Sequence, residues 1–137
     1  MVLQQRSRRK IEIGRLMFAA IFVISGLSHF LFPEPFTRIV PPFLPWPKLL
    51  VWVSGGAEIL GGVGLLARRC RRAAAYGLFV LLLAVFPANI YMAVAHIPFP
   101  GWLGKSWLQW LRLPLQIPLV FWALRYTRCE TTKPELR

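Results

Sequence analysis

Acidic and sulfur-bearing residues are scarce in this chain of 137 residues. Asp and Glu together number five against 17 Lys and Arg, and there are two cysteines and two histidines. Cys70 and Cys129 form neither a CxxC motif nor a metal-type spacing, so we expect no disulfide framework and no metal site. The sequence also has no GxSxG, HExxH or P-loop motif, and no GxGxxG opening a helix after a strand. No recognised catalytic motif is therefore present, and the pattern leaves open whether the protein is an enzyme.

Apolar residues, in contrast, are abundant. They make up 56% of the chain and its mean hydropathy is +0.52, which is too apolar for an ordinary soluble domain of this size. The net charge of +12 could indicate a nucleic-acid partner, but the basic residues stand in short blocks between apolar runs. That arrangement is typical of membrane proteins, so we expect a lipid bilayer, and no nucleic acid, as the partner.

Four apolar runs predict four membrane-spanning helices, at about residues 16–32, 49–67, 73–95 and 107–124. The predicted membrane domain, residues 16–124, lies between a basic head of residues 1–15 and a polar tail of residues 125–137. The first run lacks a small-residue cleavage site and leads into three more spans, so we expect it in the mature protein. The predicted fold class is all-α, an integral membrane four-helix bundle.

The basic residues also predict an orientation. Five Lys and Arg lie in the head, four in the loop between the second and third spans and four in the tail, which makes 13 on one side. The other side holds three, Arg38, Lys48 and Lys105. This bias puts the N- and C-termini in the cytoplasm of a multi-pass protein. Both cysteines then face a reducing compartment, which argues against a structural disulfide.

The two predicted non-cytoplasmic connectors are rich in proline and aromatic residues. Residues 33–47 contain six prolines, which forbid a continuous helix, and several large apolar side chains. We expect this segment to lie across the mouth of the bundle with a short helical turn around residues 36–39. The alternative is a simple anchor at the membrane surface. Residues 96–102 form the second connector of this kind.

The strongly polar residues within the predicted spans all fall in the outer half of the bilayer, opposite the termini. At ~1.5 Å per residue they lie roughly 5 to 14 Å from the outer end of each span. We interpret them as one buried polar cluster or ligand-binding pocket, open or lidded toward the outside: His29, Ser54, Glu58, Asn89, Arg112 and Gln116. Glu58 and Arg112 are the natural pair, because a long arginine stem covers their difference in depth.

Each of these residues also has a purely structural interpretation. A buried Glu58–Arg112 pair can serve only to fix helix register. His29 can be a satisfied interfacial histidine, and Asn89 can cap backbone groups that Pro87 frees. Convergence in one region favours the functional interpretation, since ionisable residues within a membrane are functional candidates by default.

Five glycines surround Glu58 in the second predicted span, within Ser54-Gly-Gly-Ala-Glu-Ile-Leu-Gly-Gly-Val-Gly64. Small residues of this kind allow close approach of neighbouring helices in membranes. We therefore expect this helix to form the inner wall of the bundle.

Several spaced motifs together resemble one known family. They are Gly26-Leu-Ser-His-Phe30 with Pro33 and Phe36, Ile39-Val-Pro-Pro-Phe-Leu-Pro45, Ser54-Gly-Gly-Ala-Glu58 with Gly61-Gly62, and Phe86-Pro-Ala-Asn-Ile90. Over about residues 14–125 the chain resembles the DoxX family of small bacterial membrane proteins. The resemblance implies a four-helix protein of the bacterial cytoplasmic (inner) membrane. Some relatives are linked to quinone-coupled sulfur oxidation or to thiol and oxidative-stress systems, often as accessory subunits. The chain has no paired redox cysteines, which argues against direct thiol exchange.

Three hypotheses for function follow. The first is a redox-associated accessory subunit with a quinone-like molecule in the outer pocket, where Arg112, His29 and Asn89 hydrogen-bond its polar head. Glu58 would then hold Arg112 or relay a proton. The second is a structural or assembly subunit without a ligand site, which uses its glycine-rich faces to bind a membrane protein partner or a second copy. The third is a small transporter, which four spans without detectable repeats make less favoured.

Overall fold

The structure is a computed structural model that describes residues 2–101 and 105–127. These residues form helices and connecting loops, with no strand among them. The elements are α1 (Val2–Leu31), α2 (Pro33–Arg38), α3 (Pro47–Leu66), α4 (Arg71–Val94) and α5 (Ser106–Thr127). Cys129 and nearly all of the predicted polar tail lie outside the described residues. The all-α prediction is confirmed for the described part of the chain.

Three helical segments are long and apolar enough to cross a membrane, namely Arg9–Leu31, Pro47–Leu66 and Arg71–Val94. They mark the chain as a membrane protein and match the first three predicted spans. Helix α5 is not among them, although its 22 residues cover the fourth predicted span. Its exposed side chains include Trp107, Leu115, Ile117 and Phe121. The polar residues Gln109, Arg112 and Gln116 make the helix less apolar than α3 and α4.

The ends of the helices differ in detail from the predicted boundaries. Helix α1 begins at Val2, so the basic head continues the first helix rather than standing apart from it. The predicted helical turn in the first connector is present as α2, whose first residue is Pro33. Proline suits this position because its missing N–H has no partner in the first turn of a helix. Helix α4 continues through Pro87 to Val94.

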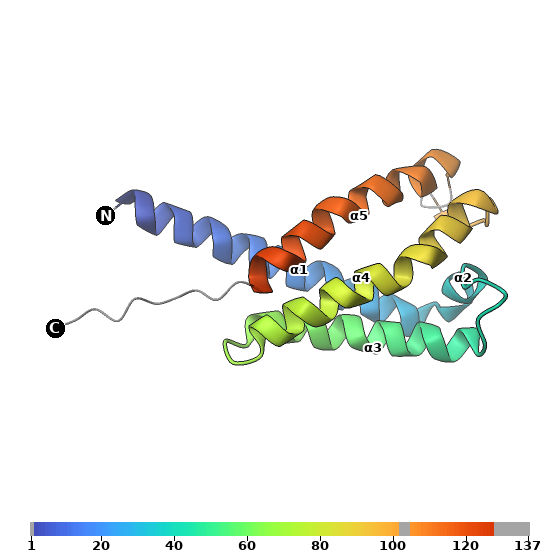
Figure 1. Ribbon diagram of the computed structural model, residues 1–137, viewed down its shortest axis with the longest axis horizontal. Coiled ribbons are helices and arrows are strands. Elements are labelled where there is room, and N and C mark those ends of the chain that lie inside the picture. The colour runs from blue at the N-terminus through green and yellow to red at the C-terminus, as the bar shows by residue number, and fades with distance from the viewer. Residues whose placement is uncertain (1, 102–104, 128–137) are drawn as a thin grey trace.

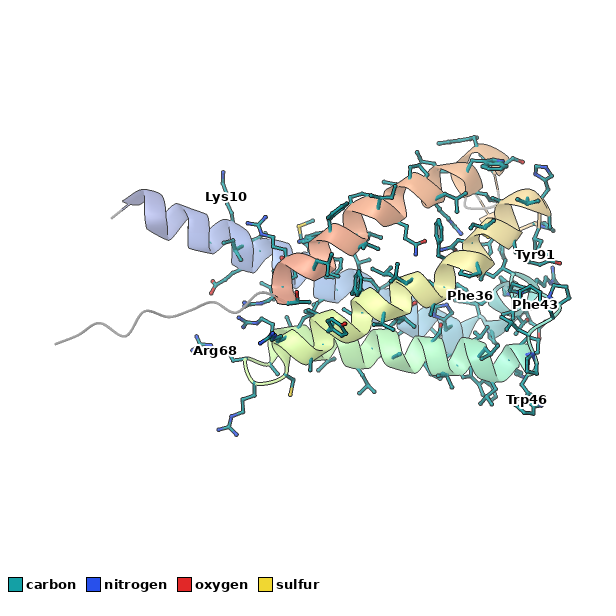
Figure 2. The ribbon with its side chains drawn as sticks, in the orientation of Figure 1. Lys10, Phe36, Phe43, Trp46, Arg68 and Tyr91 are labelled. Atoms are coloured by element: carbon teal, nitrogen blue, oxygen red, sulfur yellow. The ribbon has the colours of Figure 1, made fainter. Side chains whose placement is uncertain are left out.

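The helices pack in chain order, α1 on α3, α3 on α4 and α4 on α5 (Figure 1). Helix α1 begins, and α5 ends, on the same side of the molecule as the α3–α4 loop; we call this the terminal end. Helix α2 and residues 95–101 lie on the opposite side, the connector end. Figure 2 shows Lys10 and Arg68 toward the terminal end, and Phe36, Phe43 and Tyr91 at the connector end.

The apolar core lies mainly in the terminal half. Phe18 and Leu65 are fully buried, and Phe18 contacts the α5 side chain Trp122, with ring centroids 4.7 Å apart. Trp122 Nε1 donates a hydrogen bond to the hydroxyl of Tyr126, 2.9 Å away. The outside of the helices is also apolar, and Leu60, for example, is 75% exposed. A continuous apolar exterior of this kind is expected where lipid replaces water around a protein.

Glycines set the close approach of α3 to both neighbours. An added Cβ on Gly26 of α1 would lie 2.5 Å from the backbone oxygen of Gly55, and one on Gly62 would lie 2.8 Å from that of Ala19. On the other face of α3, a Cβ on Gly64 would lie 2.7 Å from the Cβ of Ala74 on α4. The predicted role of these glycines is confirmed, with the exception of Gly56, whose added Cβ meets nothing.

Candidate functional site

A buried acid–imidazole pair joins α1 to α3. His29 and Glu58 are 8% and 7% exposed, and His29 Nδ1 lies 3.6 Å from Glu58 Oε2. This distance allows electrostatic attraction but is too long for a hydrogen bond. Neither atom has a hydrogen-bond partner among the described residues. The two buried atoms therefore keep hydrogen-bonding capacity that no described residue uses.

The local sequence explains why this pair forms. Gly26 lies one turn before His29, and Gly55 lies one turn before Glu58, and these two glycines are in close contact. The two helices run in opposite directions, so Gly26 lies opposite Glu58 and Gly55 lies opposite His29, with an added Cβ on Gly55 2.7 Å from His29 Cβ. Helical side chains lean toward the N-terminus of their own helix, so His29 and Glu58 both lean toward the glycine contact and meet there. The side chain of Ser25 on α1 also lies close to the Glu58 carboxylate. The α1–α3 network is therefore His29, Glu58 and Ser25.

A second network joins α4 to α5 through side-chain amides. Asn89 Nδ2 donates to Gln116 Oε1 over 3.0 Å, and Gln116 Nε2 donates to the backbone oxygen of Leu82. Leu82 precedes Pro87 by little more than one turn, in a stretch of α4 where the proline removes a backbone donor. The carbonyl that Pro87 leaves without its helical donor is that of Leu83, so Gln116 bonds to the carbonyl beside it and does not replace the missing donor. Gln109 Nε2 similarly donates to the backbone oxygen of Ile97, 2.7 Å away, and holds the second connector against α5.

Arg112 lies on α5 between Gln109 and Gln116, half-buried and without a carboxylate. Its Nη1 is 3.7 Å from the sulfur of Met92, and its guanidinium carbon is 5.2 Å from the centroid of the Phe99 ring. The second contact is a cation–π interaction. Within the described residues no acidic side chain comes within 4.0 Å of Arg112. In the described part of the chain, the guanidinium therefore contacts a thioether and an aromatic ring face and no negatively charged group.

Aromatic rings connect the two networks. The His29 ring lies 4.0 Å from the ring of Phe36 on α2, and Phe36 lies 5.3 Å from Phe99 with the planes 78° apart. Phe99 in turn lies under Arg112. From the α1–α3 network to the α4–α5 network, the successive groups in contact are therefore the His29 imidazole, the Phe36 and Phe99 rings and the Arg112 guanidinium. Each phenyl ring comes from a connector, and Figure 2 shows Phe36 at the connector end.

The structure groups the six predicted residues differently from the sequence-based prediction. It brings His29 to Glu58 and Asn89 to Gln116, and it leaves Ser54 half-buried without a contact to either network among the described residues. The predicted pairing of Glu58 with Arg112 is wrong. Glu58 faces α1, because the glycines allow α1 to approach α3 closely, whereas Arg112 faces Met92 on α4.

Phe36 and Phe99 are the residues that the sequence-based prediction missed as site members. Both were part of the predicted Pro/aromatic connectors, but nothing in their spacing indicates that they meet each other. Met92 and Gln109 are two further buried members, at 0% and 2% exposure. No group of three or more His, Cys, Asp or Glu that could hold a metal ion occurs within residues 2–101 and 105–127. The groups that remain can donate hydrogen bonds, accept them or exchange a proton.

The described residues form an all-helical protein with three helices that are long and apolar enough to cross a membrane and with buried polar groups toward one end. The chain belongs to the family described as a domain of unknown function, DUF8561, whose family model matches residues 18–127. That range covers α2 to α5 completely, together with the part of α1 that carries His29. No curated protein and no solved structure matches the chain.

Proposed function

We propose that this chain is a DoxX-like four-helix protein of the bacterial cytoplasmic membrane, with its terminal end in the cytoplasm. We further propose that it holds a quinone-like molecule in its outer half, as an accessory subunit of a redox system. The three apolar helices support the first part, and α5 would complete the bundle by packing its polar side chains on α4. The basic residues of the α3–α4 loop support the orientation, since positive charge favours the cytoplasmic side.

The guanidinium of Arg112, which meets no carboxylate among the described residues, is the observation that carries the ligand proposal. A permanent positive charge beside apolar groups is costly unless an electron-rich partner meets it. Met92 and Phe99 provide only a thioether and a ring face. A ligand oxygen would form a charge-assisted hydrogen bond with Arg112, which is among the stronger hydrogen bonds in proteins.

The path from Arg112 to His29 suggests the shape of the ligand. Two phenyl rings occupy this path, so a ligand head group would have to displace one of them, and an aromatic ring of similar size would keep the contacts with the ring that remains. A quinone carries one oxygen at each side of such a ring. One oxygen would accept from Arg112, and the other would face the unused polar atoms of His29 and Glu58. Phe36 or Phe99 would shift to admit the ring, and both belong to connectors rather than to long helices.

Binding of a short-chain quinone such as menadione to the purified protein tests this proposal. Isothermal titration calorimetry in detergent would compare Arg112→Gln with Arg125→Gln, an exposed arginine on the same helix. Loss of a charged hydrogen bond costs ~1.5–3 kcal/mol. Arg112→Gln should therefore bind menadione at least about tenfold more weakly, and Arg125→Gln should bind like the wild type. Equal affinities for both variants, with unchanged helicity, would sink the quinone proposal.

A structural or assembly subunit is the second candidate, and a groove near the α3–α4 loop favours it. The groove lies between α3 and α4, encloses about 360 Å³ and includes Gly61, Gly64, Ala74 and Gly77 in its lining. Small residues of this kind allow a foreign helix to approach closely. Replacing Gly77 by Leu should then release a partner that co-purifies with the wild-type protein, and it should leave menadione binding unchanged.

A further inference from the structure

A surface hollow opens at the start of α3, at the connector end and apart from both polar networks. It has a volume of about 470 Å³ and is lined by Trp46, Pro47, Lys48, Leu49 and Trp52. The ammonium Nζ of Lys48 lies 5.3 Å from the centroid of the Trp52 ring, at a cation–π distance. Trp46 has a left-handed backbone, with φ 51° and ψ 59°, which is unusual for a bulky residue. Strained positions of this kind tend to occur at binding sites.

The positive charge of Lys48 in this hollow favours a negatively charged ligand. In the described part of the chain, no carboxylate lies within 4.0 Å of Lys48. Arg38 and Lys105 also lie in the connectors, whereas Glu34 is the single acidic residue in them. The walls of the hollow are tryptophan, proline and leucine, which do not suit a fully hydrated ion. A molecule with an anionic head and an apolar body fits both features.

An apolar stripe continues from the hollow along the outside of α3. Its members are spaced three or four residues apart and so share one face: Leu49, Val53, Gly56, Leu60 and Val63. The four side chains are 51%, 61%, 75% and 54% exposed. A Cβ on Gly56 would meet no atom within 4 Å, so this glycine is not needed for packing within the chain. Because Gly56 has no side chain, the apolar stripe has a shallow depression at its middle.

The stripe is longer than the hydrocarbon thickness of one leaflet of a bilayer. From Leu49 to Val63 it covers about 21 Å at ~1.5 Å per residue. Half of the ~30 Å hydrocarbon core is about 15 Å. The stripe is therefore long enough to hold the whole of an acyl chain that starts near Lys48 and passes over Gly56.

We infer that the hollow and the stripe bind one anionic phospholipid. Lys48 holds the phosphate between the rings of Trp46 and Trp52, and one acyl chain lies along the stripe over Gly56. The inference rests on the membrane placement proposed above and is independent of the quinone site. Tryptophan and lysine are suited to this depth, because each combines an apolar body with a polar end that reaches the interface.

Native mass spectrometry of the detergent-purified protein, titrated with phosphatidylglycerol or phosphatidylcholine, tests both halves of the site. Lys48→Gln should weaken phosphatidylglycerol binding about fivefold and leave phosphatidylcholine binding unchanged, since one lysine near a charged lipid surface contributes ~1 kcal/mol. Lys105→Gln, an exposed lysine at the same end, is the matched control and should change neither. Gly56→Leu should reduce binding of both lipids. Its control is Gly77→Leu on α4, where an added Cβ also meets nothing and binding should be retained.

The outcomes separate this inference from the proposal on which it rests. Equal phosphatidylglycerol binding by the Lys48 and Lys105 variants, or wild-type binding by Gly56→Leu, would overturn the lipid site and leave the membrane placement intact. Absence of bound lipid from the wild type and all variants would overturn both. Menadione binding should be the same in all four variants, because none of the changes touches Arg112 or His29.

Discussion

The glycine contact between α1 and α3 gives the sharpest prediction about how the site is built. Replacing Gly26 by Ala puts a Cβ 2.5 Å from the backbone oxygen of Gly55, 2.8 Å from Ile59 Cγ1 and 3.1 Å from Glu58 Cβ. In real structures a Cβ atom essentially never lies within 3.0 Å of a non-bonded heavy atom. The nearest atom belongs to the backbone, so a side-chain rotation cannot relieve the clash. Helices α1 and α3 must move apart, and His29 must move away from Glu58.

The size of the effect follows from a comparison with Gly56→Ala. Either change replaces glycine by alanine inside a helix, which favours the helix by up to ~1 kcal/mol. Only Gly26→Ala adds an overpacking cost, typically ~1–3 kcal/mol. The difference between the two unfolding free energies removes the shared helix term. We expect Gly26→Ala to be less stable than Gly56→Ala by ~1–3 kcal/mol.

Unfolding in mixed micelles, followed by circular dichroism as the fraction of sodium dodecyl sulfate rises, measures this difference. Glycine-to-alanine changes keep the side chain small and uncharged, so detergent binding should be comparable between the variants. Equal stability of the two variants, within ~0.5 kcal/mol, would show that α1 and α3 do not meet at Gly26. The basis for the His29–Glu58 pair would then be lost.

Three further predictions concern the pair, the amide network and the orientation. A double-mutant cycle with His29→Gln and Glu58→Gln should give a coupling of ~0.5–3 kcal/mol in the unfolding free energy, as for other residues in contact. If the effects of the two changes simply add, the pair does not interact. Gln116→Leu should destabilise the protein by ~1–3 kcal/mol, because it leaves Asn89 and a backbone oxygen without their partner, and a neutral effect in the same denaturation assay would contradict this network. Cys70 is exposed in the α3–α4 loop. In a Cys129→Ser variant it should resist a membrane-impermeant maleimide in intact cells and react after lysis, and labelling of intact cells would reverse the proposed orientation.

The positions of the helices were predictable from the sequence, because the apolar runs and the basic blocks between them indicate where each helix begins and ends. Helix α3 begins at Pro47 and ends at Leu66, within two residues of the predicted span. Prolines likewise indicated where the connectors lie, and the first connector contains a short helix as expected. These features depend on local composition, which is visible in the chain without knowledge of its neighbours.

The pairing of polar groups was less predictable, because depth along a helix does not determine which helix a side chain faces. Glu58 and Arg112 lie in the same predicted outer half, yet α3 and α5 each pack mainly on other helices. A better signal was present in the sequence. Gly26 precedes His29 by three residues and Gly55 precedes Glu58 by three, and where two antiparallel helices meet at such glycines each polar side chain lies beside the other helix's glycine and leans toward the contact. The contact of Phe36 with Phe99 had no such signal, because it depends on how two connectors fold over the same end.

The central claim is that the two polar networks form one site, joined by Phe36 and Phe99. A double-mutant cycle with Phe36→Leu and Phe99→Leu tests it most directly, because leucine keeps the apolar volume and removes the ring contact. Edge-to-face rings 5.3 Å apart should couple by ~0.5–1.5 kcal/mol in the unfolding free energy. Additivity within ~0.3 kcal/mol would mean that the connectors do not meet and that the networks are two separate structural features.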